Sequence, residues 1–403
     1  MPENMDKTVV TVADRIEPQV NRYYLKVSRR YMGAGIFLML LLILYVVCVM
    51  LFFGEYVTYE NLRYLVRDWN AMSLPGSEEF TDIVYNASDD TKFRYFRSGL
   101  AVCGTDAYLY YDASGIQLID DPTGFSDPSS AASGKYMLVY DIGGKEYAVY
   151  NQLTRILSRE AEGSIIAADI ADDGSMVIVS RSRETRFVAE VYNAAFSKVM
   201  NIHKENYVLD AAVSPDGQYV ILCSAVPADT DFNAEVELCR VGSSEHVAIT
   251  NYAHTMPLDV LAKEDGFVLL CDNGLYFFSY DGRTTGSVSF EGMSLSYADM
   301  NSHSCAVVGS VNALGTRNHI LVYDGAGNKL YDKILDSRVT GAYASRDTGD
   351  ALLYLTTPDS VLKLLPDGSV QTHKPDSGEI LAVVPLEDGA LICQESGAYP
   401  WQE

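Results

Sequence analysis

The hydropathy pattern begins with an uninterrupted apolar segment at residues 31–54, which contains no charged side chain. A helix of this length rises about 36 Å, enough to cross a hydrocarbon core of roughly 30 Å. A soluble helix of similar length carries a polar stripe, and this segment has none. The pattern therefore predicts one transmembrane helix, with Tyr31, Leu40 and Phe53 in contact with the lipid bilayer.

The charges on either side of this segment predict its orientation. Arg22, Lys26, Arg29 and Arg30 precede it, whereas acidic and basic residues are mixed after it. Cationic flanks stay on the cytoplasmic side. We therefore expect residues 1–30 to form a cytoplasmic tail, mostly disordered or a short contact segment, with the large remainder outside the cell. The length of the apolar segment, and the lack of a small-residue cleavage site after it, favour an uncleaved signal anchor over a cleaved signal peptide.

Residues 55–79 connect this segment to the rest of the chain. Leu62, Leu65, Val66 and Trp69 recur at helical spacing. This predicts a juxtamembrane helix that continues the span, lies at the membrane interface or docks a partner. A linker at residues 74–79 ends it.

From residue 80 onward the pattern changes to short runs of β-forming residues that follow turns, and it repeats. The repeats are marked by one small residue each: Gly99, Gly134, Gly174, Gly217, Gly266, Ser304, Gly349 and Gly389. The spacings run from 35 to 49 residues and centre near 40, with room for four short strands in each period. Such a period is typical of a β-propeller.

Eight markers predict an all-β fold, an eight-bladed β-propeller over residues 80–403; seven blades is the alternative, if the first or last repeat is accessory. In each repeat an apolar segment before the marker suits the innermost strand, and a polar fourth strand ends the blade. The glycines are explained by turns that need positive φ. The last repeat is short, and residues 80–87 form a spare strand. Because an open edge strand promotes aggregation, we expect this strand to complete the final blade.

Charge narrows the classes of partner. The formal net charge is −24, and residues 1–30 carry six basic and four acidic side chains, which leaves −26 for the rest. So acidic a surface repels nucleic acid and anionic headgroups, which argues against a nucleic-acid partner.

The chain has seven cysteines, and Cys48 falls in the apolar segment. Five recur a few residues into predicted strands, in apolar surroundings: Cys103, Cys223, Cys271, Cys305 and Cys393. Such recurrence is typical of small buried hydrophobic residues. Cys223 and Cys239 are the one pair that would fall on neighbouring strands of a hairpin. The sequence does not decide whether they form a disulfide.

The sequence offers little catalytic chemistry. Six histidines are scattered among the repeats without ligand spacing, and no H-E-x-x-H, nucleophile-elbow or P-loop signature occurs. Residues 229–235 begin like a calcium loop, but Ala234 stands where an EF-hand needs Gly and Arg240 where it needs Glu. No periodic placement of acidic or histidine side chains is evident on the inner strands. We therefore predict a protein that is not an enzyme and has no cofactor and no metal.

Loop placement suggests where a partner binds. In a propeller, the loops from second to third strand and from fourth strand to the next blade emerge on one face, and such loops carry binding residues. The candidate partner-binding residues lie in these loops: Arg181, Arg183, Arg186, Asp229, Asp231, His254 and Arg317. The three arginines at 181–186 form a cationic cluster that suits an anionic partner. The alternative is a solvated hairpin tip, partly neutralised by Glu184.

The basic tail, the single span, the juxtamembrane sequence YENLRYLVRDW and the SPDG and YDG repeats together resemble a family of Gram-positive membrane-anchored propellers of unknown function. The repeats alone are similar to WD40 or YVTN-type propellers, although the Gly-His and Trp-Asp signatures of WD40 are absent. The resemblance implies a location at the surface of a bacterial cell, and it carries over no catalytic residue.

These features predict a single-pass membrane protein with its N-terminus in the cytoplasm and an extracytoplasmic propeller that serves as a binding scaffold. Its partners would be an envelope protein, a peptide or a glycan. One alternative is a sensor that passes ligand binding through the span, although 33–35 lacks the GxxxG spacing that aids helix pairing. Another is a hydrolase or lyase with its site in the channel mouth.

Overall fold

The computed structural model describes residues 7–52 and 80–401, apart from 244, 291, 347–348, 350 and 376–377. The predicted juxtamembrane helix and linker, and Phe53, lie outside the described residues. The chain divides into two compact units, Met1–Leu65 and Val66–Glu403. Each is described here by itself.

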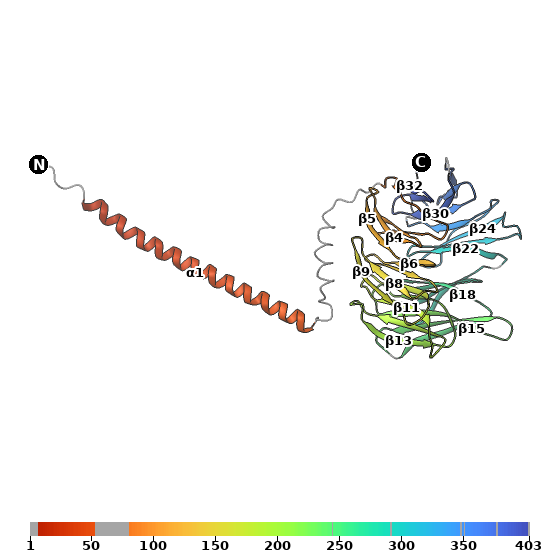
Figure 1. Cartoon of the computed structure of the whole chain (residues 1–403), viewed down its shortest axis with the longest axis horizontal. Coiled ribbons are helices and arrows are strands. Elements are labelled where there is room, and N and C mark those ends of the chain that lie inside the picture. Colours follow the sequence, from red (N-terminus) through yellow and green to blue (C-terminus); the bar gives the residue numbers. More distant parts are fainter. Residues whose placement is uncertain are drawn as a thin grey trace. The chain divides into compact units, whose positions relative to one another are not determined.

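The first unit contains one long helix, α1 (Lys7–Phe52) (Figure 1). Its segment Lys26–Cys48 is long and apolar enough to cross a membrane. The side chains of Tyr31 and Leu40 are 76% and 60% exposed, as lipid-facing positions require.

The helix also covers residues 7–30, so the expectation of a mostly disordered tail is wrong there. The expectation overlooked a helical period in the tail itself. Val9, Val12, Ile16 and Val20 follow one another at steps of three or four residues. Such steps place apolar side chains on one face of a helix.

The second unit is an eight-bladed propeller, which confirms the predicted fold class and blade number, and Figure 1 shows its sheets following one another in chain order. Each blade is a four-stranded antiparallel sheet, numbered here in chain order. Blades 1 and 2 contain β2 (Lys92–Phe96), β3 (Gly99–Cys103), β4 (Ala107–Asp112), β5 (Gln117–Pro122), β6 (Pro128–Ala132), β7 (Met137–Asp141), β8 (Glu146–Tyr150) and β9 (Arg155–Glu160). Blades 3 and 4 contain β10 (Ile165–Ile170), β11 (Met176–Arg181), β12 (Phe187–Tyr192), β13 (Lys198–Lys204), β14 (Tyr207–Val213), β15 (Tyr219–Pro227), β16 (Phe232–Arg240) and β17 (His246–Tyr252).

The second half of the ring repeats this arrangement. Blades 5 and 6 contain β18 (Pro257–Lys263), β19 (Gly266–Cys271), β20 (Gly274–Ser279), β21 (Thr284–Ser289), β22 (Ser294–Met300), β23 (Ser304–Ser310), β24 (Asn318–Asp324) and β25 (Lys329–Leu335). Blades 7 and 8 contain β26 (Gly341–Ala344), β27 (Leu353–Thr356), β28 (Val361–Leu364), β29 (Val370–His373), β30 (Ile380–Pro385), β31 (Ala390–Gln394), β32 (Gly397–Pro400) and β1 (Ile83–Val84).

Blade 8 is built from both ends of the propeller, as the spare strand predicted. β1 pairs antiparallel with β32, with Ile83 opposite Ala398 and Val84 opposite Gly397. The backbone N–H of Ala87 extends the contact by donating to the carbonyl of Glu395 at 2.8 Å. This strand covers the edge that the C-terminal strand would otherwise expose.

The marker residues lie at the turns between first and second strands, but positive φ explains only part of them. Gly174, Gly217 and Gly389 have φ of 96°, 67° and 80°. Gly266 has ordinary φ, and a Cβ there would come within 1.9 Å of the Phe278 carbonyl oxygen. Close approach of the third strand therefore requires glycine at that position.

The core consists of eight hydrophobic clusters, one between each pair of neighbouring blades. The cysteines predicted to be small core residues are buried there. Cys223 and Cys239 lie on the paired strands β15 and β16, but Cys223 is opposite Val236 and Cys239 opposite Val220. The offset of three residues places the two thiols on opposite faces of the sheet, and both are free.

Candidate functional site

The eight innermost strands surround a central channel that contains a cavity of about 630 Å³. Its walls come from the inner strands of blades 1 to 6 and from the turn after β26. Several inner strands carry a β-bulge near their first residues, at Ile166 in β10, Leu209 in β14 and Leu258 in β18. A bulge twists the strand and turns extra residues out of the ladder, and all three of these side chains line the cavity.

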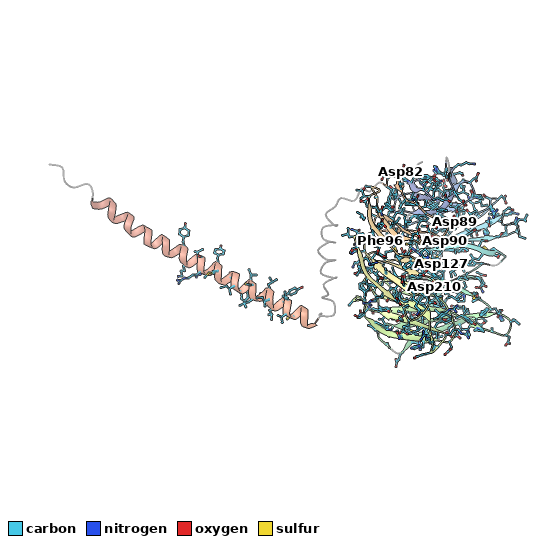
Figure 2. All side chains as sticks on the ribbon, in the orientation of Figure 1. Asp82, Asp89, Asp90, Phe96, Asp127 and Asp210 are labelled. Carbon is cyan, nitrogen blue, oxygen red and sulfur yellow. The ribbon has the colours of Figure 1, made fainter. Side chains whose placement is uncertain are left out.

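Four consecutive blades each contribute one aspartate to the cavity. These channel aspartates are Asp169 in β10, Asp210 in β14, Asp259 in β18 and Asp299 in β22. Asp210, labelled in Figure 2 among the side chains of the propeller, and Asp259 come directly after their bulges. Asp169 and Asp299 come three residues after theirs, which places them two positions, or roughly 6–7 Å, further along the channel.

Three of these carboxylates link neighbouring blades. Oδ2 of Asp169 accepts a hydrogen bond from the backbone N–H of Val213 at 2.8 Å. Oδ2 of Asp210 accepts one from Val260 at 2.9 Å. Asp299 does the same with Ala344, at 2.7 Å.

In every case the donor belongs to the inner strand of the next blade. A backbone N–H that faces the channel therefore has a side-chain acceptor. Such a bond contributes about 0.5–1.5 kcal/mol in a typical protein. The links give the channel aspartates a structural role whatever else they do.

Burial within the channel disfavours the charged form of three of these acids, Asp169, Asp210 and Asp299. Burial raises the pKa of Asp169 to about 6 and also raises that of Asp299. For Asp210, burial and then the neighbouring carboxyl of Asp259 raise the pKa well above its ordinary value. The Asp259 carboxyl thus favours the protonated form of Asp210.

Two arginines from the other side of the ring line the same cavity. Arg94 of β2 donates from Nε to the Ser130 hydroxyl at 3.2 Å. The guanidinium of Arg346, after β26, lies 5.0 Å from the centre of the Tyr95 ring, and the enclosing protein lowers its pKa. The channel is thus electrostatically polarised, with carboxyl groups on blades 3 to 6 and guanidinium groups on blades 1 and 7.

The sequence-based statement that no acidic side chains recur on the inner strands is therefore wrong. The channel aspartates precede the repeat markers Gly174, Gly217, Gly266 and Ser304 by five or seven residues. Each is a single acid in an otherwise apolar segment, which is the signal that identifies them. The recurrence is hard to see in the sequence because the aspartates at the two levels of the channel stand at different distances from their repeat markers.

The loop face carries the residues predicted to bind a partner. Antiparallel pairing places second-to-third-strand loops and blade-to-blade connections at the same end of each sheet, as expected. Arg181 ends β11, and Arg183 and Arg186 follow in its hairpin loop, all three exposed. The Arg186 guanidinium lies 4.4 Å from the centre of the Tyr207 ring, in blade 4.

The other predicted residues fall in two further places. In blade 4, Oδ2 of Asp231 lies 2.7 Å from Nδ1 of His254, and the His254 backbone N–H donates to the Asn233 side chain. Asp229 is exposed at the tip of the same hairpin. Arg317 is in blade 6, where its Nε lies 3.3 Å from an Asp336 oxygen. The structure therefore brings together the sites on blades 3 and 4 and leaves Arg317 apart.

Exposed aromatic rings, which the sequence did not single out, join the blade 3 and blade 4 sites. The ring of Tyr207 lies 6.3 Å from that of Phe187 and 6.4 Å from that of Phe232, measured between centroids. Tyr207 and Phe232 are 40% and 36% exposed. With Arg181, Arg183 and Arg186 they form a surface that we call the blade 3–4 patch.

A known structure shares the propeller fold. The chain aligns with the crystal structure of BamB from Moraxella catarrhalis at a TM-score of 0.53 and 13% identity, over 81% of this chain and 97% of that one. It also aligns with Kuenenia stuttgartiensis hydrazine synthase at a TM-score of 0.46 and 12% identity, over 75% of this chain and 99% of that one. At 13% identity the likeness to BamB concerns the fold alone.

Sequence comparison gives a narrower result. No curated protein matches the sequence. The profile of a family of unknown function, DUF5711, matches residues 77–390, which span most of the propeller.

Proposed function

Because the chain belongs to DUF5711, a family of unknown function, we propose its role from its own architecture: a membrane-anchored scaffold whose extracytoplasmic propeller binds partners at the bacterial cell surface. The observation that carries this proposal is the pairing of a closed propeller with one apolar helix whose basic flank lies on the tail side. The basic flank favours a cytoplasmic N-terminus and a propeller on the other side of the membrane.

The proposed partner is an envelope protein, peptide or glycan that presents an acidic group to the blade 3–4 patch. Arginine provides fork-shaped donors for carboxylates, and exposed tyrosine and phenylalanine rings add contact area. The patch is cationic on a chain whose net charge is −24. An anionic segment is therefore attracted to the patch and repelled by the rest of the surface. Two blades contribute to it, which provides a rigid platform.

A pull-down from solubilised envelope with the full chain tests this site. The variant Arg181→Ala/Arg183→Ala/Arg186→Ala should lose most of the recovered partner, because each lost charge-assisted contact costs about 1.5–3 kcal/mol. Arg283→Ala is the matched control, since Arg283 is exposed and lies between β20 and β21, at the opposite end of the sheets. Unchanged recovery with the triple variant would remove the patch as the binding site.

A second candidate function, hydrolase or lyase chemistry in the channel, is favoured by the Asp210–Asp259 pair. A carboxyl group with a raised pKa, such as that of Asp210, can act as a proton donor to a bound substrate. We place binding ahead of catalysis because three channel aspartates already serve as acceptors between blades. Incubating the full chain with peptide and glycan libraries, and comparing products with those of Asp259→Asn by mass spectrometry, separates the two. A product that the variant does not form would support catalysis.

A further inference from the structure

A second cavity, separate from the channel, lies between the outer strands of blades 3 and 4. It has a volume of about 440 Å³. Its lining comes from β13 and from the hairpin of β16 and β17: Met200, Asn201, Ile202, His203, Cys239, Gly242, Ser243, Glu245 and His246. None of the proposed partner-binding residues belongs to it.

Three possible metal ligands meet at the edge of this cavity. Glu237 and Cys239 are two residues apart in β16, so their side chains share one face of the sheet. His246 is opposite Cys239 across the hairpin, at a β-bulge. The Glu237 Oε1 atom lies 2.7 Å from His246 Nδ1 and 3.1 Å from Cys239 Sγ, and the sulfur lies 3.5 Å from the same nitrogen.

Burial and charge hold this group in place. The Glu237 and Cys239 residues are 1% and 3% exposed, whereas half of the His246 side chain is open to solvent. The Lys204 ammonium of β13 pairs with the other carboxylate oxygen of Glu237, and with Glu235 at 2.8 Å. Oε1 of Glu237 is thereby directed at the thiol and the imidazole.

A purely structural reading of the group is a hydrogen-bond network, in which Glu237 accepts from the thiol and the imidazole. That reading explains Lys204 and Glu237 but not the choice of cysteine, because its thiol is a weak donor. A sulfur, an imidazole nitrogen and a carboxylate oxygen, all mutually within 3.5 Å, are a donor set typical of zinc. In a tetrahedral zinc site, the ligand atoms lie roughly 3.3–3.6 Å from one another. Small outward shifts of Oε1 would therefore complete the geometry.

We propose that Glu237 Oε1, Cys239 Sγ and His246 Nδ1 bind a divalent transition-metal ion, with zinc as the preferred ion. On binding, the Cys239 thiol releases its proton to solvent and binds as the thiolate, while the neutral imidazole and the carboxylate bind as they are. Thiolate and carboxylate together balance the two positive charges of the ion. Lys204 pairs with the other Glu237 oxygen and so orients the carboxylate without touching the ion.

Cys239 and His246 also line the cavity of about 440 Å³, which leaves room for a fourth ligand from outside the protein. Three protein ligands with one open position are typical of zinc sites that exchange a water or a small ligand. The site therefore suits an ion that takes an outside ligand, and it does not depend on the proposed partner-binding role.

Cobalt(II) is the probe, because a cobalt–thiolate bond gives a strong near-ultraviolet charge-transfer band. The full chain in detergent is treated with a chelator and titrated with Co²⁺. The expected result is a charge-transfer band that saturates at one ion per chain and disappears when Zn²⁺ is added. No band at saturating Co²⁺, or a band that survives Cys239→Ser, overturns the proposal.

Cys223→Ser is the matched control, since Cys223 is a buried thiol on the paired strand but faces blade 5. It should retain the band. His246→Ala removes a half-exposed ligand, and urea midpoints check that each variant is folded. If Cys239→Ser does not fold, His246→Ala still decides the question: the expected result is at least about tenfold weaker Co²⁺ binding, and unchanged binding contradicts the site.

Discussion

At the scale of single residues, the channel aspartates show how burial sets chemistry. Asp169 is the simplest, because its pKa is raised to about 6 mainly by burial. Between its ordinary pKa near 4 and this value, the folded chain binds more protons than the unfolded chain. Stability therefore falls as pH rises through this window, and stays lower above it.

Asp169→Asn tests that sign. The amide keeps an oxygen for the Val213 N–H and has no proton to lose. Relative to the natural chain, it should gain roughly 1–3 kcal/mol of unfolding free energy at about pH 7.5 and nothing at about pH 4. Urea denaturation at both pH values measures the difference. The control is Asp229→Asn at an exposed hairpin tip, and an equal gain there, or a gain at the lower pH, would contradict the account.

The close approach at Gly266 is a second residue-scale feature. Gly266→Ala would place a Cβ within 1.9 Å of a backbone oxygen, so strands must separate; we expect a loss of about 2–4 kcal/mol. Gly286→Ala is the control in the same blade, where the nearest atom is 3.8 Å away. It should change stability by no more than about 0.5–1 kcal/mol. Similar midpoints for the two variants in urea denaturation would show that packing does not require Gly266.

At the scale of elements, the ring depends on the two-residue strand β1. Ile83 is 2% exposed and packs between blades 8 and 1, whereas its neighbour Val84 is 79% exposed. Ile83→Ala should therefore cost about 2–4 kcal/mol, and Val84→Ala close to nothing. Chemical denaturation of the full chain measures both. Equal effects would mean that this strand does not close the propeller.

The elements also show which features of the fold could be predicted from the sequence and which could not. The repeat and the blade number follow from local turn chemistry around residues such as Gly174 and Gly389, and the closing strand follows from the short last repeat and the spare strand at residues 80–87, so all three were predictable. The tail helix was missed although Val9 to Val20 recur at helical spacing, because the stretch is polar overall. Whether Cys223 and Cys239 form a disulfide depends on the strand register, which the composition does not predict.

The candidate sites were harder to predict for a related reason. The channel aspartates come from four different repeats, and only the closed ring brings them to one cavity. Similarly, Arg186 precedes β12 in blade 3 and Tyr207 begins β14 in blade 4, so they are neighbours only because the two blades are adjacent. The loop face itself was predictable from topology, but the rings that extend the arginine cluster were not, since their exposure depends on packing between blades.

At the scale of the whole molecule, the chain consists of an apolar helix and a closed, acidic propeller. The helix α1 has the length to cross a bilayer, and the blade 3–4 patch and the channel are both on the propeller. A scaffold at the cell surface requires that the propeller and the tail lie on opposite sides of the membrane. Everything proposed about envelope partners depends on that arrangement.

Cysteine labelling on intact cells that express the chain measures this arrangement directly. The described cysteines of the propeller are buried, so a membrane-impermeant maleimide gives little background there. Asp229→Cys adds an exposed thiol on the loop face, and Asp14→Cys adds one to the tail. The account predicts that Asp229→Cys is labelled in intact cells and Asp14→Cys only after permeabilisation. The reverse pattern would contradict it.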